Sequence, residues 1–387
     1  MRSQVPATRV VSTLKAAASY GIVAVGVTVI LLVATEGLSR FALRASGWVN
    51  RHVQPPPSQY AGKPWVDALQ RETAAAERYQ YHPYVIWRRA PYEGQQLVID
   101  SNGLRRTLHT ACGEGALNIF MFGGSALWGS GSPDWGTIPS QVAKVLEDNS
   151  GRPACVRNYG ESAWVSTQEV LQLILALKDG ERPDLVLFYD GWNDITSRYQ
   201  TGVPDAHANL YDIKEQFERS PARRLGGSSG TMKLVDRIST ALKFRKPYLE
   251  RYRLQEEPLD VVPASIRDRY LRNVEIVDAL ADRYGFRYAF FWQPMILAEE
   301  KALTDEEQRI VTISSVHPDL TRMTQETYRL MKDTQRPNLF YVGDVFREEP
   351  NTVYLDWVHV DPEANGMIAR RMVELLQSRG YLKGRKG

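Results

Sequence analysis

Residues 117–131 read LNIFMFGGSALWGSG, an apolar run that ends on two glycines and a serine. The run from Leu117 to Phe122 has the length and the continuous apolar character of a buried β-strand. The small residues behind it allow two interpretations. Either they form a tight turn that only needs a flexible backbone, or they hold Ser125 at the carboxyl end of the strand, as a nucleophile on the first turn of a helix.

Strands and helices alternate from residue 117 onward, which is typical of a parallel sheet with helices on its faces. Further strands are predicted at 155–159, 184–189, 286–292 and 338–342, and helices near 137–149, 166–180, 264–284, 317–333 and 363–379. We therefore expect an α/β fold of three layers, α/β/α, around a central, mostly parallel sheet of five strands. A polar insertion at about 200–262 interrupts the alternation, and insertions at this position often form a lid or a substrate wall.

The N-terminal region contains an uncharged run, residues 16–35, that is long enough to cross a bilayer. Arg2, Arg9 and Lys15 precede the run, so the positive-inside rule places the N-terminus in the cytoplasm and the remainder outside. A cleaved signal peptide is the alternative, but its apolar region is normally shorter. The predicted organisation is a cytoplasmic segment at 1–15, a transmembrane signal anchor at 16–36, a linker at 37–59, a small extended covering region at 60–114 and a periplasmic or cell-surface catalytic domain at 115–383.

The composition excludes some functions. A formal net charge of +3 over 387 residues, without clustered Lys and Arg on one face, gives no indication of a nucleic-acid partner. The histidines show no spacing typical of metal ligands, so we expect no metal site and no cofactor. The two cysteines, Cys112 and Cys155, each precede a predicted strand. If these strands are parallel neighbours, the two thiols pair in an oxidising compartment; the alternative is two unrelated buried thiols.

The predicted strand ends carry the residues of an acyl-transfer site. In a sheet of this kind, ligands bind beyond the carboxyl ends of the strands. Ser125 follows the first strand, Gly160 the second and Asn193 the third, whereas Asp356 and His359 precede the last helix. His359 would take the proton of Ser125, and Asp356 would orient the imidazole ring. The backbone N–H groups of Ser125 and Gly160, with the side-chain amide of Asn193, would form an oxyanion hole.

These residues lie in four blocks that resemble those of the SGNH (GDSL-type) hydrolase superfamily, and the chain looks like a membrane-anchored, bacterial-type member. The blocks are Gly123-Gly124-Ser125-Ala-Leu-Trp-Gly129, Gly160, Gly191-Trp192-Asn193-Asp194 and Asp356-Trp-Val-His359. The resemblance covers about residues 115–380 and implies a flavodoxin-like fold with a serine nucleophile. One departure is Gly124, which replaces the aspartate of the family's first block.

Several residues beside the expected triad have supporting roles in this interpretation. Gly124 and Gly191 would shape their loops, and Asp194 would brace its loop without a direct role in the chemistry. Three tryptophans that flank the blocks are either core residues or platforms on which sugar rings stack, namely Trp128, Trp192 and Trp357.

The expected function is that of a membrane-tethered serine esterase that removes small acyl groups, in particular acetyl, from an extracytoplasmic glycan or a related small ester. A glycan O-acyltransferase with the same triad is one alternative, because it shares the acyl-enzyme half-reaction. A non-catalytic glycan-binding or assembly factor is another, although the intact set of catalytic residues argues against it. A lipase is disfavoured because the insertion at about 200–262 is too polar for a large acyl-chain groove.

Overall fold

The computed structural model describes residues 7–53, 57–150, 153–218, 229–241, 260–314 and 317–382. The chain divides into two compact units. One contains residues 1–56 and 212–251, and the other contains residues 57–211 and 252–387.

The larger unit is built on one five-stranded sheet, as the sequence predicts. Its strands have the order β6-β5-β7-β8-β9, and every neighbouring pair is parallel. Their bounds are β5 Leu117–Gly123, β6 Ala154–Asn158, β7 Leu185–Asp190, β8 Arg287–Trp292 and β9 Leu339–Tyr341. Every residue of β7 is buried, as expected of a central strand covered on both faces.

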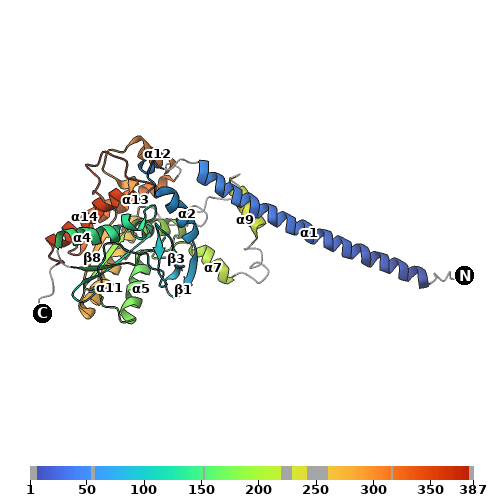
Figure 1. The fold of residues 1–387 in the computed structure, drawn as a ribbon, viewed down its shortest axis with the longest axis horizontal. Coiled ribbons are helices and arrows are strands. Elements are labelled where there is room, and N and C mark those ends of the chain that lie inside the picture. Colours follow the sequence, from blue (N-terminus) through green and yellow to red (C-terminus); the bar gives the residue numbers. More distant parts are fainter. Residues whose placement is uncertain are drawn as a thin grey trace. The chain divides into compact units, whose positions relative to one another are not determined.

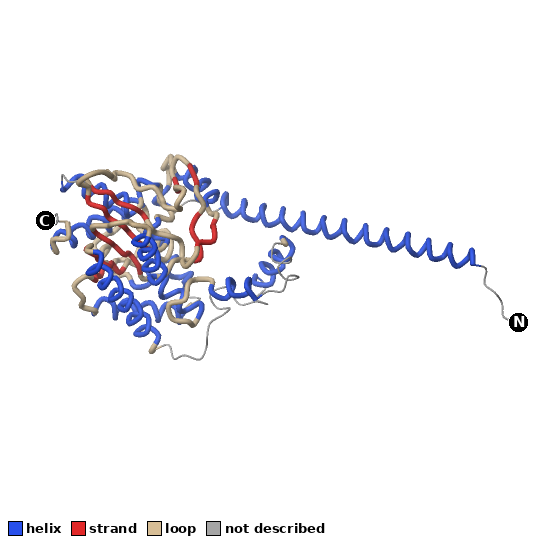
Figure 2. The backbone as a smooth tube through the Cα atoms, turned by 90° about the horizontal axis from the view of Figure 1, so that it is seen from below, coloured by secondary structure: helices blue, strands red, loops and turns tan. Residues whose placement is uncertain are grey.

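The connecting helices form the two outer layers. They are α4 Ile138–Ser150, α5 Ser166–Lys178, α11 Val262–Tyr284, α13 Pro318–Asp333 and α14 Pro362–Ser378. The chain passes from β5 to the edge strand β6 and then runs back across the sheet, so right-handed crossovers place α4 on one face and α5, α11 and α13 on the other. In agreement, α14 packs on α4, and α11 contacts both α5 and α13 (Figure 1). Figure 2 shows the strands lying among these helices.

Shorter helices complete the connections between these elements. They are α3 Ser125–Trp128, η2 Asp134–Gly136, α6 Trp192–Thr201, α7 Leu210–Glu218, η3 Ile296–Ala298 and α12 Asp305–Ser314. The N-terminal part of the larger unit contains η1 Ser58–Tyr60, α2 Val66–Ala76, the antiparallel pair β1 Tyr79–His82 and β2 Ile86–Arg89, and the antiparallel pair β3 Tyr92–Glu93 and β4 Val98–Ile99. The covering region expected at 60–114 is therefore partly helical.

A disulfide ties this covering region to the edge of the sheet. Cys112 is bonded to Cys155 of β6, with a Cα–Cα distance of 4.5 Å. The predicted pairing is thus confirmed, and it closes a loop over a sequence separation of 43 residues.

The smaller unit contains one long helix, α1 Ala7–Val53. Residues 37–53, which we expected to form a linker, continue this helix. Within the described residues, Val23–Ala45 is the one segment long and apolar enough to cross a membrane, with a mean hydropathy of 1.6. It overlaps the anchor predicted at 16–36, although a signal sequence near the N-terminus shares these properties, so the choice between the two stays a prediction.

Part of the insertion packs against this helix. The insertion contributes α9 Gly230–Ala241. Residues at the start of this helix donate hydrogen bonds to the carboxylate of Glu36. The contacts come from the backbone N–H of Thr231 at 3.0 Å and from the hydroxyl of Ser229 at 2.8 Å. A role of the insertion as a lid or substrate wall stays a prediction, and residues 219–228 and 242–259 of the insertion lie outside the described residues.

Candidate active site

Ser125 begins the short helix α3 directly behind β5, in the position expected of a nucleophile. Gly124 precedes the helix in an extended conformation, and Gly129 ends it with a φ of 98°, a conformation that favours glycine. The N–H of Gly129 donates to the carbonyl of Ser125 at 2.9 Å, which closes the turn. The Oγ of Ser125 lies 2.8 Å from Nε2 of His359. The first interpretation, a turn with no further role, does not account for this contact.

His359 reaches the serine from a tight loop before α14. The N–H of Leu355 donates a hydrogen bond to the carbonyl of His359 at 2.8 Å, which joins the two ends of the loop. Nδ1 of His359 lies 2.7 Å from Oδ2 of Asp356, and Oδ1 of Asp356 accepts the N–H groups of Val358 and His359 at 3.0 and 2.9 Å. Loss of hydration would raise the pKa of Asp356, but the neighbouring imidazole and these hydrogen bonds together lower it below its ordinary value. The carboxylate therefore stays ionised and can stabilise an imidazolium.

Asn193 lies against the nucleophile loop. Its amide Nδ2 donates to the carbonyl of Trp164 at 2.7 Å, which fixes the side chain. A Cβ added at Gly124 would lie 2.2 Å from the same nitrogen. This contact gives a physical reason for glycine at position 124, because a side chain there would displace the amide.

Close packing requires glycine at position 160. A Cβ at this position would lie 2.6 Å from the backbone nitrogen of Trp128, so the end of β6 packs too closely on α3 for any side chain. The N–H of Gly160 donates a hydrogen bond to Oδ1 of Asn158 at 2.9 Å. Its role as an oxyanion donor stays a prediction, and in that role the N–H would have to leave Asn158 and bind the oxyanion instead.

Gly191 and Asp194 support the start of α6. Gly191 has a φ of 142° and lies against the ring of Trp292. Oδ1 of Asp194 accepts the hydroxyl of Ser166, the first residue of α5, at 2.6 Å. Burial, followed by the negative charge of Asp190, raises the pKa of Asp194 to about 7. These contacts fit a bracing role between α6 and α5, away from the reacting atoms.

The tryptophans beside the blocks have different environments. Trp128 is 1% exposed, and the guanidinium groups of Arg89 and Arg105 lie 3.9 and 4.4 Å from its ring. Of the two roles left open for it, Trp128 therefore has that of a core residue and is not a surface on which a substrate can stack. Trp192 is also buried and forms an edge-to-face pair with Trp357 at 5.3 Å between ring centroids. Trp357, two residues before His359, is half-buried, so a role as a stacking surface stays a prediction.

Arg105 is a residue of the site region that sequence reasoning missed. Its buried guanidinium donates to the carbonyls of Trp128, Gly129 and Ser132 at 3.1, 2.7 and 2.6 Å, and its Nε pairs with Asp134 at 2.9 Å. It therefore holds the backbone that follows the nucleophile helix. No motif marks it, because it lies outside the four blocks and reaches this backbone through tertiary structure.

The described residues contain no group of three or more His, Cys, Asp or Glu side chains arranged to hold a metal ion. The site that the structure brings together consists of the Ser125 hydroxyl, the His359 imidazole and the Asp356 carboxylate, with the Asn193 amide beside the nucleophile loop.

Comparisons with known proteins find similarity only among solved structures. No protein-family profile matches the chain, and no curated protein matches it. The acetyl xylan esterase AlAXEase is 11% identical, with 66% of this chain and 98% of that chain covered and a TM-score of 0.36. A member of the lipolytic protein G-D-S-L family from Veillonella parvula is 10% identical, with 68% and 99% covered and a TM-score of 0.34. An acetyl-xylooligosaccharide esterase from Geobacillus is 16% identical, with 70% and 99% covered and a TM-score of 0.31.

Proposed function

We propose that the chain is an SGNH-type serine esterase that removes small acyl groups, in particular acetyl, from a glycan or a related small ester. The observation that carries the proposal is the line of contacts from Ser125 Oγ to His359 Nε2 at 2.8 Å and from His359 Nδ1 to Asp356 at 2.7 Å. A serine hydroxyl becomes an effective nucleophile when a base in contact with it accepts its proton. The three residues come from two distant parts of the chain, so local backbone structure alone does not explain their meeting.

The proposed reaction has two halves. Ser125 Oγ attacks the ester carbonyl while His359 Nε2 takes its proton, and the tetrahedral oxyanion accepts hydrogen bonds from the Ser125 N–H and the Asn193 amide. The protonated His359 then donates its proton to the departing alcohol, which leaves an acyl group on Ser125. In the second half His359 takes a proton from a water molecule, which attacks the carbonyl of this acyl group. The bond between Ser125 Oγ and the acyl carbon then breaks, Ser125 Oγ takes the proton back from His359, and the carboxylic acid is released.

Two features favour a glycan or another polar ester over a long-chain lipid, namely the polar insertion at about 200–262 and the ring of Trp357. Trp357 offers a half-buried aromatic surface close to His359, and aromatic faces pack well against sugar rings.

We further propose that α1 anchors the protein in a membrane with its N-terminus in the cytoplasm and the catalytic unit outside. A C-terminal reporter that is active only in the cytoplasm should stay inactive in this topology; an active reporter would contradict it.

The substrate class is tested by a chain-length series on the full-length, detergent-solubilised protein. We expect p-nitrophenyl acetate to be cleaved with a higher kcat/KM than the octanoate, and acetylated xylo-oligosaccharides to release acetate. Free sugar acceptors added to the same reaction should not capture the acetyl group. Preference for the long ester would contradict the small-acyl assignment, and acetylated acceptor in place of free acetate would favour a transferase. If the folded protein cleaves no p-nitrophenyl ester, releases no acetate from the oligosaccharides and acetylates no acceptor, an enzymatic function is contradicted.

A further inference from the structure

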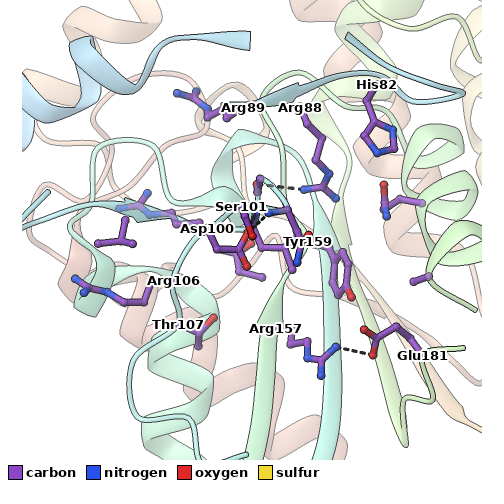
Figure 3. A pocket seen from close by; sticks show the side chains of 18 of the residues that line it. His82, Arg88, Arg89, Asp100, Ser101, Arg106, Thr107, Arg157, Tyr159 and Glu181 are labelled. Carbon is purple, nitrogen blue, oxygen red and sulfur yellow. Dashed lines mark hydrogen bonds and ion pairs between the residues drawn. The ribbon is translucent and has the colours of Figure 1, made fainter. Parts of the chain in front are cut away.

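A cavity of about 940 Å³ lies beside the edge strand β6, outside the catalytic loops. Its walls come from the β1–β2 hairpin, the segment after β4, β6 and α5, as Figure 3 shows in part. Neither Ser125, Asn193, Asp356 nor His359 is among the residues that line it. Cavities of about 300–1,000 Å³ commonly hold small-molecule ligands.

Arg88 is the unusual residue of this cavity. Its side chain points toward Tyr159 in Figure 3, and the residue is only 4% exposed. Its Nη1 makes a long contact of 3.5 Å with the carbonyl of Gly103, whereas its Nη2 has no hydrogen-bond partner. Among the described residues, no carboxylate lies within ion-pair distance of this guanidinium. Burial lowers the pKa of Arg88, which reflects the cost of keeping an unpaired cation away from water.

The other arginines that line the cavity have carboxylate partners. Arg157 pairs with Glu181 at 2.6 Å, and Arg105 and Arg106 both pair with Asp134 at 2.9 Å. Arg89 lies 3.4 Å from the buried Glu161. Arg88 is therefore the lining arginine without a carboxylate in direct contact, and only the more distant charges of Glu161 and Asp100 act on it. Three further lining atoms are buried without a hydrogen-bond partner, namely Arg89 Nε, Thr107 Oγ1 and Gln172 Oε1.

The loop over Arg88 is fixed by its own hydrogen bonds. Oδ1 of Asp100 accepts the N–H groups of Asn102 and Leu104 at 2.8 and 2.9 Å. Gly103 has a φ of 76°, and a Cβ there would lie 2.9 Å from the carbonyl of Arg89 and 3.1 Å from Cδ of Arg88. The backbone at Gly103 therefore packs directly against the Arg88 side chain. The Arg88 guanidinium also lies 4.7 Å from the ring centroid of Trp164.

We propose that this cavity is a second, non-catalytic binding site for a sugar-sized ligand that carries an oxyanion, such as a carboxylate or a phosphate. The anion binds the Arg88 guanidinium, whose planar fork suits two parallel hydrogen bonds to such a group. Thr107 and Gln172 supply hydrogen bonds for ligand hydroxyl groups, and Tyr81, which is 74% exposed, offers a ring face among the lining residues. The proposal goes beyond the esterase reaction and does not depend on it.

Isothermal titration calorimetry on the full-length, detergent-solubilised protein tests this site. The probes are trigalacturonate, inorganic phosphate and the neutral trisaccharide xylotriose. We expect saturable binding of at least one anion and none of xylotriose; the anion that binds better identifies the ligand as a uronate or a phosphorylated compound. Arg88→Gln should weaken that binding by roughly tenfold or more, the usual effect of losing a hydrogen bond to a charged group. Arg371→Gln, which removes an exposed arginine from α14, is the control and should bind as wild type does.

Two further variants separate this site from the catalytic site and from a structural role. Thr107→Val keeps the shape of the side chain and should weaken binding through loss of its hydroxyl, whereas Ser125→Ala should leave binding unchanged. Without ligand, the melting temperature of Arg88→Gln should equal or exceed that of wild type, because a buried charge that has no direct ion pair is removed. Absence of saturable binding to both anions, unchanged binding by Arg88→Gln, or a melting temperature several degrees below wild type would each overturn the proposal.

Discussion

Gly124→Ala is expected to impair catalysis although it adds only a methyl group. The backbone at Gly124 has φ −76° and ψ −158°, which alanine adopts without strain. The new Cβ would, however, lie 2.2 Å from Nδ2 of Asn193, so one of the two groups must move. The amide is held by a 2.7 Å hydrogen bond to Trp164 and can retreat only by leaving the nucleophile loop. Since one oxyanion donor is worth about 3 kcal/mol of barrier, we expect kcat to fall about 100–1,000-fold.

A double-mutant cycle gives this prediction its control. Kinetic constants for p-nitrophenyl acetate are measured for wild type, Gly124→Ala, Asn193→Ala and the double variant, with circular dichroism to show that each is folded. When Asn193 is already alanine, the methyl group at position 124 has no amide to displace. The double variant should therefore be about as active as Asn193→Ala alone. Wild-type activity of Gly124→Ala, or fully additive losses in the cycle, would refute the assignment of the Asn193 amide as an oxyanion donor.

Three predictions concern the framework around the site. Arg105→Met should lower the free energy of unfolding by about 3–5 kcal/mol in a urea titration, because it leaves buried Asp134 without its main partner; a loss below about 1 kcal/mol would contradict the role given to this arginine. Asp194 has its pKa raised from 3.8 to about 7, so it binds its proton more tightly in the folded state, and the stability it contributes is present below pH 4 and lost as the pH rises toward 7. Asp194→Asn should flatten this decline in the melting temperature, and an unchanged pH profile would count against it. Replacing both Cys112 and Cys155 by serine should cost roughly 3–4 kcal/mol of stability, and mass spectrometry of unreduced wild-type protein exported from the cytoplasm should find no free thiol.

Much of the architecture could be predicted because its signals are local. The buried strands are continuous apolar runs, and each is followed by a helix with apolar periodicity, so both the element types and the parallel sheet follow from the pattern. The candidate triad could be predicted for the same reason. Ser125, Asp356 and His359 lie next to predicted element ends, and parallel topology brings such ends to one edge of the sheet.

The features that were missed depend on contacts between distant segments. Arg105 lies about twenty residues before the nucleophile helix in an unremarkable segment, and only the folded chain brings it to the carbonyl groups it binds. Trp128 lies three residues after Ser125, yet the guanidinium groups of two arginines of the covering region pack against its ring. The close approach of Gly160 to α3 likewise depends on how two elements pack, which no periodicity records.

The proposed nucleophile can be tested most directly by intact-protein mass spectrometry after incubation with a fluorophosphonate probe. We expect one adduct on the wild-type chain, located by peptide mapping to Ser125, and no adduct on folded Ser125→Ala. His359→Ala should react roughly a hundredfold or more slowly, because the serine then lacks the base that contacts it. A folded Ser125→Ala protein that is labelled at the wild-type rate, or an adduct that maps to a different serine, would contradict the central claim.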